Sequence, residues 1–212
     1  MGKKLVIISL IIFISVIAYF ISWFDYILIL AVVLVLAFLI LIGLISIFRK
    51  LTKKFYKLPL VILVVCVFGL IVSLFRPYDK AIINSNNTSE NLKYAYETDQ
   101  SDRKELKSFI GYFSRLEERD NIRLNQVKKL RDQEELSKSM DMFYAAFVYH
   151  HSDNKEDYKI ASELAARAAV DNGLKDNYLV QWLRKASYDR YMLSIGKPEK
   201  YNTQNNFSMD IE

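Results

Sequence analysis

Hydrophobic residues are concentrated in three uncharged runs within the first third of the 212-residue chain, at 5–22, 27–48 and 58–75. A helix needs about 20 apolar residues to cross the hydrocarbon core of a bilayer, and each run is close to that length. None of the runs has a polar face, which argues against amphipathic helices lying on a membrane surface. The pattern therefore predicts a membrane anchor over residues 1–78 with three transmembrane helices.

The connections between these runs predict which side of the membrane each end faces. Residues 49–57 contain five basic and no acidic side chains, and Lys3 and Lys4 precede the first run. Because basic residues are retained in the cytoplasm, both segments are expected there. Everything after Arg76 is then expected outside, in the periplasm or the cell exterior of a bacterium. The predicted location is a bacterial inner membrane that the chain crosses several times.

Two alternatives to this topology stay open. Arg76 and Lys80 follow the third run and are only partly offset by Asp79. If this local charge outweighed the 49–57 loop, the rest of the chain would be cytoplasmic. If the first run were a cleaved signal peptide, the sidedness would not change, but its apolar stretch is longer than the roughly 7–15 residues typical of such peptides.

The charges of the chain are divided unevenly between its two parts. Of the 29 basic and 24 acidic residues, the first 75 positions hold seven bases and one acid, Asp25. The remaining 22 bases and 23 acids nearly cancel, so the second part lacks the basic surface of nucleic-acid-binding domains, and nucleic acid is not an expected partner. No run contains an internal Asp, Glu, Lys, Arg or His, which argues against a transporter or proton channel.

Beyond the third run, turn-forming residues predict a polar linker at 79–101, followed by an all-α soluble domain at 102–206 and a tail at 207–212. Asp102 and Glu105 form a capping-box pattern at the start of the first expected helix. Four to five helices packed as hairpins are expected. Their apolar stripes lie at 106–116, 122–130, 136–148, 158–169 and 179–193.

Known chemical motifs are missing from the sequence. It contains no Gly-rich phosphate loop, nucleophile elbow or metal-ligand pattern, and the single cysteine, Cys66, excludes an intrachain disulfide. No cofactor or metal is therefore expected, and whether the chain is an enzyme is left open. His150 and His151 are the first suspects for acid–base work, but adjacent helical side chains point about 100° apart and do not chelate one ion together.

Asp189 and Arg190 lie on the last expected helix and have two interpretations. In one, each forms a buried ion pair with another helix. In the other, His150, Asp189, Arg190 and the segment Tyr201-Asn202-Thr203-Gln204 surround one polar pocket. The sequence alone does not decide whether these residues converge.

Three segments, at 143–151, 157–169 and 189–204, resemble a widespread bacterial domain family of unknown function. Its members carry Gln-His-Gly after the first of these helices and end in Asp-Arg-Tyr-Leu, Gly-x-Pro-Gln and Tyr-Gly-Thr-Gln. The similarity covers residues 102–206. The segment from Met142 to Gly173 is more weakly similar to the helical hairpins of Sel1-like and tetratricopeptide repeats, which bind peptides, although no second copy follows at a fixed period.

The chain departs from the family motif at four positions, with His150 for Gln, Ser152 for Gly, Glu199 for Gln and Asn202 for Gly. Asn tolerates the left-handed conformation that a Gly would serve, so the turn is expected to persist, whereas a site that needs Gln at 199 is in question. The resemblance implies no reaction. It implies that the residues to test first are His151, Asp189, Arg190, Tyr201, Thr203 and Gln204.

The architecture favours a membrane-anchored helical module that binds a protein or peptide at the cell envelope, for instance in defence or immunity. The expected partners are the lipid bilayer and that protein or peptide, and the oligomeric state is not predicted. The alternative is an enzyme or small-ligand binder that uses the polar motif around His151, Asp189, Arg190 and Gln204.

Overall fold

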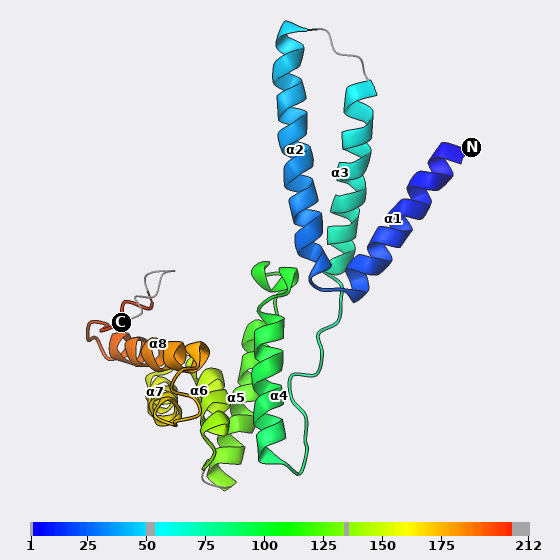
Figure 1. The fold of residues 1–212 in the computed structure, drawn as a ribbon. Helices are drawn as coiled ribbons and strands as arrows, with labels where there is room; N and C mark the ends of the chain where they lie inside the picture. Colours follow the sequence, from blue (N-terminus) through cyan, green and yellow to red (C-terminus); the bar gives the residue numbers. More distant parts are fainter. Residues whose placement is uncertain (1, 50–53, 134–135, 205–212) are drawn as a thin grey trace. The chain divides into compact units, whose positions relative to one another are not determined.

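All regular structure in the described part of the chain is helical (Figure 1). The computed structural model describes residues 2–49, 54–133 and 136–204. Over these ranges the chain forms eight α-helices and one short 3-10 helix, without a strand, which confirms the predicted all-α class there. Residues 50–53 of the expected basic loop and the expected tail at 207–212 lie outside the described residues.

The chain divides into two compact units. Unit 1 comprises Met1–Tyr78 and Lys104–Ser114, and unit 2 comprises Asp79–Arg103 and Arg115–Glu212. The chain therefore passes between the units three times. This division differs from the predicted one, in which residues 102–206 form a single domain.

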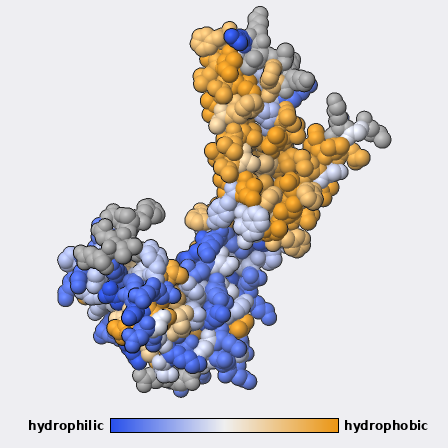
Figure 2. All heavy atoms as spheres, in the orientation of Figure 1, coloured by the Kyte–Doolittle hydropathy of each residue, from blue (hydrophilic) through white to orange (hydrophobic). Residues whose placement is uncertain are grey.

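Unit 1 is built on helices α1 (Gly2–Phe20), α2 (Phe24–Phe48) and α3 (Lys54–Ser73). Apolar residues cover all three, as the orange surface in Figure 2 shows. Among the described residues, two helices are long and apolar enough to cross a membrane, α2 over its full length and α3 from Phe55. The first helix falls short, with 17 residues over Lys4–Phe20. The prediction of three spans is thus supported by length and composition for two.

The interior of unit 1 is small and depends on a glycine. Ala18, Leu28 and Cys66 form its buried cluster, with one residue from each helix. A Cβ at Gly69 would lie 3.0 Å from side-chain atoms of both Ile14 and Leu28, so only Gly permits this approach without rearrangement. Small residues of this kind allow membrane helices to approach one another closely.

Unit 2 surrounds a central helix. Its helices are α4 (Thr88–Asp102), α5 (Leu116–Gln133), α6 (Ser139–His150), α7 (Lys155–Ala169) and α8 (Tyr178–Ser194). Helix α6 contacts each of the other four, and all but one of its residues from Asp141 to His150 are buried. The last four helices occur where the apolar stripes predict them.

The expected linker at 79–101 is wrong over most of its length, because α4 lies there. The side chain of Asn87 caps this helix by accepting hydrogen bonds from the backbone N–H groups of Ser89 and Glu90. Leu92 and Ala95 then lie buried on its inner face. Asn87, one of the turn-forming residues that suggested a linker, is therefore the N-cap of a helix.

The first expected helix, from Asp102 to Leu116, is also wrong. Asp102 is the last residue of α4, Leu106–Phe109 forms the 3-10 helix η1, and α5 begins at Leu116. Instead of capping a helix, the carboxylate of Asp102 accepts bidentate hydrogen bonds from Arg119 at 2.6 and 3.1 Å. The side chain of Asp102 therefore forms a buried ion pair and not the predicted capping box.

Candidate functional site

The most concentrated chemistry of unit 2 is a group of carboxylates and guanidinium groups between α4 and α5. We call it the acid–arginine cluster. Its members are Asp99, Asp102, Arg103, Arg119, Asp120 and Arg123. The charges of three acids and three bases balance, which is the condition for burying so many of them.

Arg123 lies at the centre of the acid–arginine cluster, with a fully buried side chain. Its guanidinium group donates to Asp102, to Asp120 at 3.1 Å and to the hydroxyl of Thr98 at 3.2 Å. Removing Arg123 is expected to cost about 3–5 kcal/mol, because the charge of Asp102 would be left uncompensated in the interior. This half of the cluster joins α4 to α5.

The other half of the acid–arginine cluster extends to the end of α6. Arg103 bridges two carboxylates, at 3.0 Å from Asp99 and 2.7 Å from Asp120. Nδ1 of His151 lies 3.1 Å from Oδ1 of Asp99, where an Nδ1–H donates to the carboxylate. The predicted candidate His151 is therefore tied to an acid that sequence reasoning did not select.

The environment separates the pKa values of the two acids that Arg103 bridges. Burial opposes the ionisation of Asp99, but the hydrogen bond from His151 and the charges of His151 and Arg103 hold its pKa below the ordinary value. Burial raises the pKa of Asp120 to about 6; Asp99 adds to this rise and Arg103 opposes it. One acid stays ionised, while the other titrates close to neutral pH.

The environment of the two histidines favours their neutral forms. Burial lowers the pKa of His151, against the hydrogen bond and charge of Asp99. Burial also lowers the pKa of His150 far below its ordinary value, and the charge of Arg190 adds to this effect. The Nδ1 atom of His150 is buried without a hydrogen-bond partner among the described residues. The two side chains diverge, as their adjacent helical positions predict, and His151 alone reaches the acid–arginine cluster.

A pocket of about 220 Å³ opens beside the acid–arginine cluster. Four of its lining residues come from α5 and three from the turn between α6 and α7: Glu117, Asp120, Asn121, Leu124, His151, Ser152 and Asp153. Small-molecule sites usually have volumes of about 300–1,000 Å³, so this pocket is better matched to one inserted side chain. Its three carboxylates favour a cation.

The pocket contains part of a catalytic arrangement. An Asp–His pair resembles the orienting half of a hydrolase triad, but the hydroxyl of Ser152 donates to Asp157 at 2.8 Å. Ser152 is thus held by another acid. Among the described residues, no group of three or more His, Cys, Asp or Glu side chains is arranged to hold a metal ion.

The C-terminal candidates come together, and their polar atoms bind one another and the backbone. Asp189, fully buried on α8, accepts hydrogen bonds from the N–H groups of Lys200, Tyr201 and Thr203 and from the Thr203 hydroxyl at 2.8 Å. The backbone of Asn202 has a φ of 55°, the left-handed conformation expected there. Asp189 therefore organises the 200–204 turn.

Arg190 joins this turn to α6. Its guanidinium group donates to the backbone carbonyl of His150 at 2.6 Å and to Oε1 of Gln204 at 3.1 Å. The amide of Gln204 donates in turn to the carbonyl of Ala186 at 3.0 Å. This arrangement brings Arg190, Gln204 and the backbone of His150 together, whereas the side chain of His151 lies in the other site.

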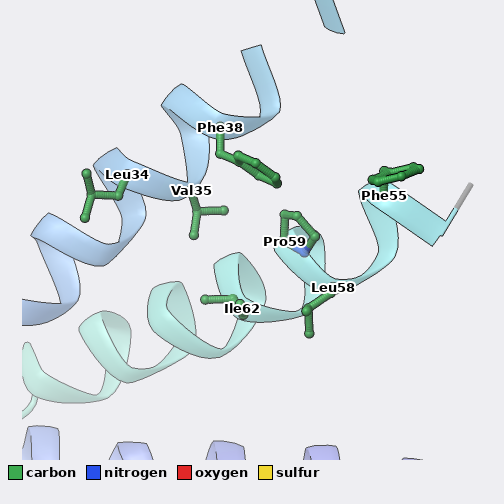
Figure 3. Close-up of a pocket in the computed structure, with 7 residues that line it drawn as sticks. All are labelled: Leu34, Val35, Phe38, Phe55, Leu58, Pro59 and Ile62. Atoms are coloured by element: carbon green, nitrogen blue, oxygen red, sulfur yellow. The ribbon is translucent and has the colours of Figure 1, made fainter. Parts of the chain in front are cut away.

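Unit 1 contains a second, larger cavity, an apolar groove of about 490 Å³ between α2 and α3. Figure 3 shows Val35 and Phe38 of α2 pointing toward Pro59 of α3. The remaining lining residues are Leu34, Phe55, Leu58 and Ile62. Because no polar side chain lines it, this groove has no group for acid–base or nucleophilic chemistry.

Sequence reasoning missed the acid–arginine cluster because its helices look like ordinary charged surface helices. A signal was nevertheless present. Asp99, Asp102 and Arg103 recur at three- and four-residue spacing, as do Arg119 and Arg123, so each set shares one helix face. Two such faces of mixed charge can pair, but only the fold shows that they meet.

Comparisons of the chain with protein-family models, with curated proteins and with solved structures find no match. Membership of the family that residues 102–206 resemble therefore stays a prediction.

Proposed function

We propose that the protein is a multi-pass membrane protein whose unit 2 binds a protein or peptide partner outside the membrane. The proposal of a membrane location rests on the exposure of apolar side chains along α2 and α3. In the most apolar 18-residue stretch of α2, only 11% of the stretch is buried inside the protein. The corresponding share for α3 is 22%. Leu34, Ile40 and Val64 each expose more than half of their surface. Burial in lipid removes this apolar surface from water.

The proposal includes α1 as a third crossing helix. Its 19 residues extend about 28 Å at 1.5 Å per residue, close to the thickness of the hydrocarbon core. Arg76, which follows α3, donates to the carbonyls of Tyr19 and Ile21 at the end of α1, at 3.0 and 3.2 Å. These bonds give α1 a role in the folded protein, which supports its retention over cleavage.

The basic loop at 49–57 supports the external placement of unit 2. Its five basic residues outnumber Arg76 and Lys80, the bases that argue for a cytoplasmic unit 2. An alkaline phosphatase fusion after Glu212, expressed in bacteria, is expected to be active. An inactive but intact fusion would contradict this placement.

The pocket beside the acid–arginine cluster is the proposed contact with the partner. Glu117 and Asp153 line this pocket, and Asp120 both belongs to the cluster and lines the pocket. A lysine or arginine side chain of the partner matches both the charge and the size of this space. Unit 2 would then recognise a basic position in a peptide or protein.

A photocrosslinking residue tests this contact in cells. We expect it to capture a partner when placed at Asn121, which lines the pocket, but not at Lys129, which is exposed farther along the same helix. Combining Glu117→Lys with Asp153→Lys should abolish the adduct at position 121. Equal adducts at both positions, or adducts that survive the charge reversal, would argue against the pocket as the partner site.

One observation favours a second candidate function, an enzyme or small-ligand binder. The separated pKa values of Asp99 and Asp120 beside His151 are typical of acid–base pairs in active sites. Asp189, Arg190 and Gln204 use their hydrogen bonds to hold the 200–204 turn, so this candidate relies on His151. Binding of a free guanidinium compound to the full chain that Asp120→Asn abolishes, with no partner captured at position 121, would favour this second candidate.

A further inference from the structure

The segment Lys104–Ser114, called here the 104–114 loop, belongs to unit 1, although α4 and α5 on either side of it belong to unit 2. It contains η1 and the aromatic residues Phe109, Tyr112 and Phe113. The loop is therefore a part of the C-terminal sequence that packs with the helices proposed to cross the membrane.

Hydrogen bonds attach the 104–114 loop to the start of α2 and to the segment that follows α3. The hydroxyl of Tyr26, in the first turn of α2, donates to the carbonyl of Lys104 at 2.5 Å. After α3, the hydroxyl of Tyr78 lies 2.9 Å from that of Ser108. The loop is thus held at the end of unit 1 where α2 begins and α3 ends.

A buried group of four charges strengthens this attachment. Arg76 pairs with Asp25 and Glu105, and Lys107 pairs with Glu105 at 3.0 Å. Lys107 also donates to the carbonyl of Arg76 at 2.5 Å and lies 3.4 Å from the centre of the Tyr78 ring. All four charged side chains expose 11% or less of their surface. We call these residues, Asp25, Arg76, Glu105 and Lys107, the unit 1 ion group.

The other face of the 104–114 loop is apolar and exposed. Phe109 exposes 72% of its surface and Tyr112 exposes 92%. Phe113 packs edge-on against Phe75, which follows α3, with ring centres 5.7 Å apart. Aromatic side chains at the ends of membrane-spanning helices lie at the headgroup level of a bilayer, where one part of the ring is buried in lipid and the other is hydrated.

From this geometry we infer that the 104–114 loop inserts Phe109, Ile110 and Tyr112 into the headgroup region of the bilayer that α2 and α3 cross. The inference rests on the proposed membrane location. Its occupant is lipid rather than a second protein, because the same unit supplies the apolar helices and the loop is fixed at their ends. Unit 2 is then connected to the membrane by two chain segments in addition to the one that follows α3.

Fluorescence quenching in vesicles of phosphatidylethanolamine and phosphatidylglycerol tests this inference on the full chain. Cys66→Ala leaves a cysteine-free background, and Tyr112→Cys is labelled with an environment-sensitive dye. Ile40→Cys on α2 reports the bilayer, and Lys159→Cys on α7 reports water. All three native side chains are more than a third exposed, so labelling them does not disturb a core.

Quenching by a lipid-borne nitroxide at position 112 is expected to be about half of that at position 40 or more, and several-fold greater than at 159. If position 40 is quenched while 112 behaves like 159, the loop inference is overturned and the membrane proposal stands. A water-soluble quencher is tested in parallel. If position 112 is quenched neither by it nor by the lipid-borne nitroxide, protein covers the loop, and the inference is overturned as well. If position 40 is not quenched, the membrane proposal fails, and the loop inference fails with it.

Discussion

Both units bury groups of opposite charges, but the two groups differ in their access to solvent. In the unit 1 ion group every charged side chain is 11% exposed or less, and each charge holds one segment against another. In the acid–arginine cluster, Asp120 is 17% exposed and lines a pocket together with His151. Burial of ion pairs alone thus identifies no site. Access from a cavity is the feature that distinguishes a candidate site from a structural contact.

The largest expected effect comes from the closed half of the acid–arginine cluster. Arg123→Ala should destabilise unit 2 by about 3–5 kcal/mol, because it leaves the buried carboxylate of Asp102 short of a partner. Denaturant unfolding in detergent, followed by the fluorescence of Trp182 in a Trp23→Phe background, measures this. Arg115→Ala is the matched control, since Arg115 pairs with Glu118 on the surface and should contribute less than about 1 kcal/mol. Equal losses for both variants would contradict the buried network.

In unit 1, Arg76→Ala should cost about 2–4 kcal/mol, because Asp25 loses its partner and the end of α1 loses hydrogen bonds. A double-mutant cycle with Asp25→Ala, measured by reversible denaturant unfolding in detergent, should show coupling of more than about 1 kcal/mol. Additive effects would indicate that the two residues do not interact.

Acidification should destabilise unit 2 through its two histidines. The pKa values of His150 and His151 are lower in the folded state than the ordinary value near 6.5, so the unfolded chain binds more protons below that pH. Stability is therefore complete above about pH 6.5 and falls as the pH drops toward the folded pKa values, by at most about 1.4 kcal/mol per pH unit for each histidine. Asp120 opposes this trend, because its raised pKa favours proton uptake by the folded state.

Unfolding midpoints at several pH values between 5 and 7.5 measure this dependence. His150→Gln removes one of the titrating groups and should flatten the curve relative to the wild type. An unchanged slope in the variant would show that His150 is not the source of the acid sensitivity.

The smallest predicted effect is the difference in stability between substitutions of the two acids that Arg103 bridges. Asp99→Asn should cost about 2 kcal/mol at pH 7, because the folded protein stabilises the ionised form of Asp99. Asp120→Asn should change stability by less than about 1 kcal/mol, because burial already disfavours the ionised form of Asp120. The same unfolding assay measures both variants. Equal costs would remove the distinction between a structural acid and an acid of the pocket.

Much of the fold could be predicted from periodicity, because packing on α6 requires apolar stripes on its neighbours. The stripes at 136–148 and 158–169 correspond to α6 and α7. The start of α4 was missed because Asn87 and its polar neighbours are typical of both turns and helix caps. The 104–114 loop was assigned to a helix because its apolar residues recur at helical spacing, although they contact unit 1.

The candidate sites were less predictable than the helices. Asp189 and Thr203 contact each other because the 200–204 turn needs an acceptor for its N–H groups, a role that the predicted shared pocket did not include. The contact between His151 and Asp99 joins residues 52 positions apart. Nothing local in the sequence indicates such a pairing, because it depends on how α4 and α6 pack.

The most direct test of the membrane account is cysteine labelling in intact bacteria that express Cys66→Ala variants. With a membrane-impermeant maleimide, Lys159→Cys in unit 2 should react before lysis, whereas Lys57→Cys, the last residue of the 49–57 loop, should react only after lysis. That pattern would place unit 2 and the loop on opposite sides of the membrane. Protection of both positions until lysis would contradict the account.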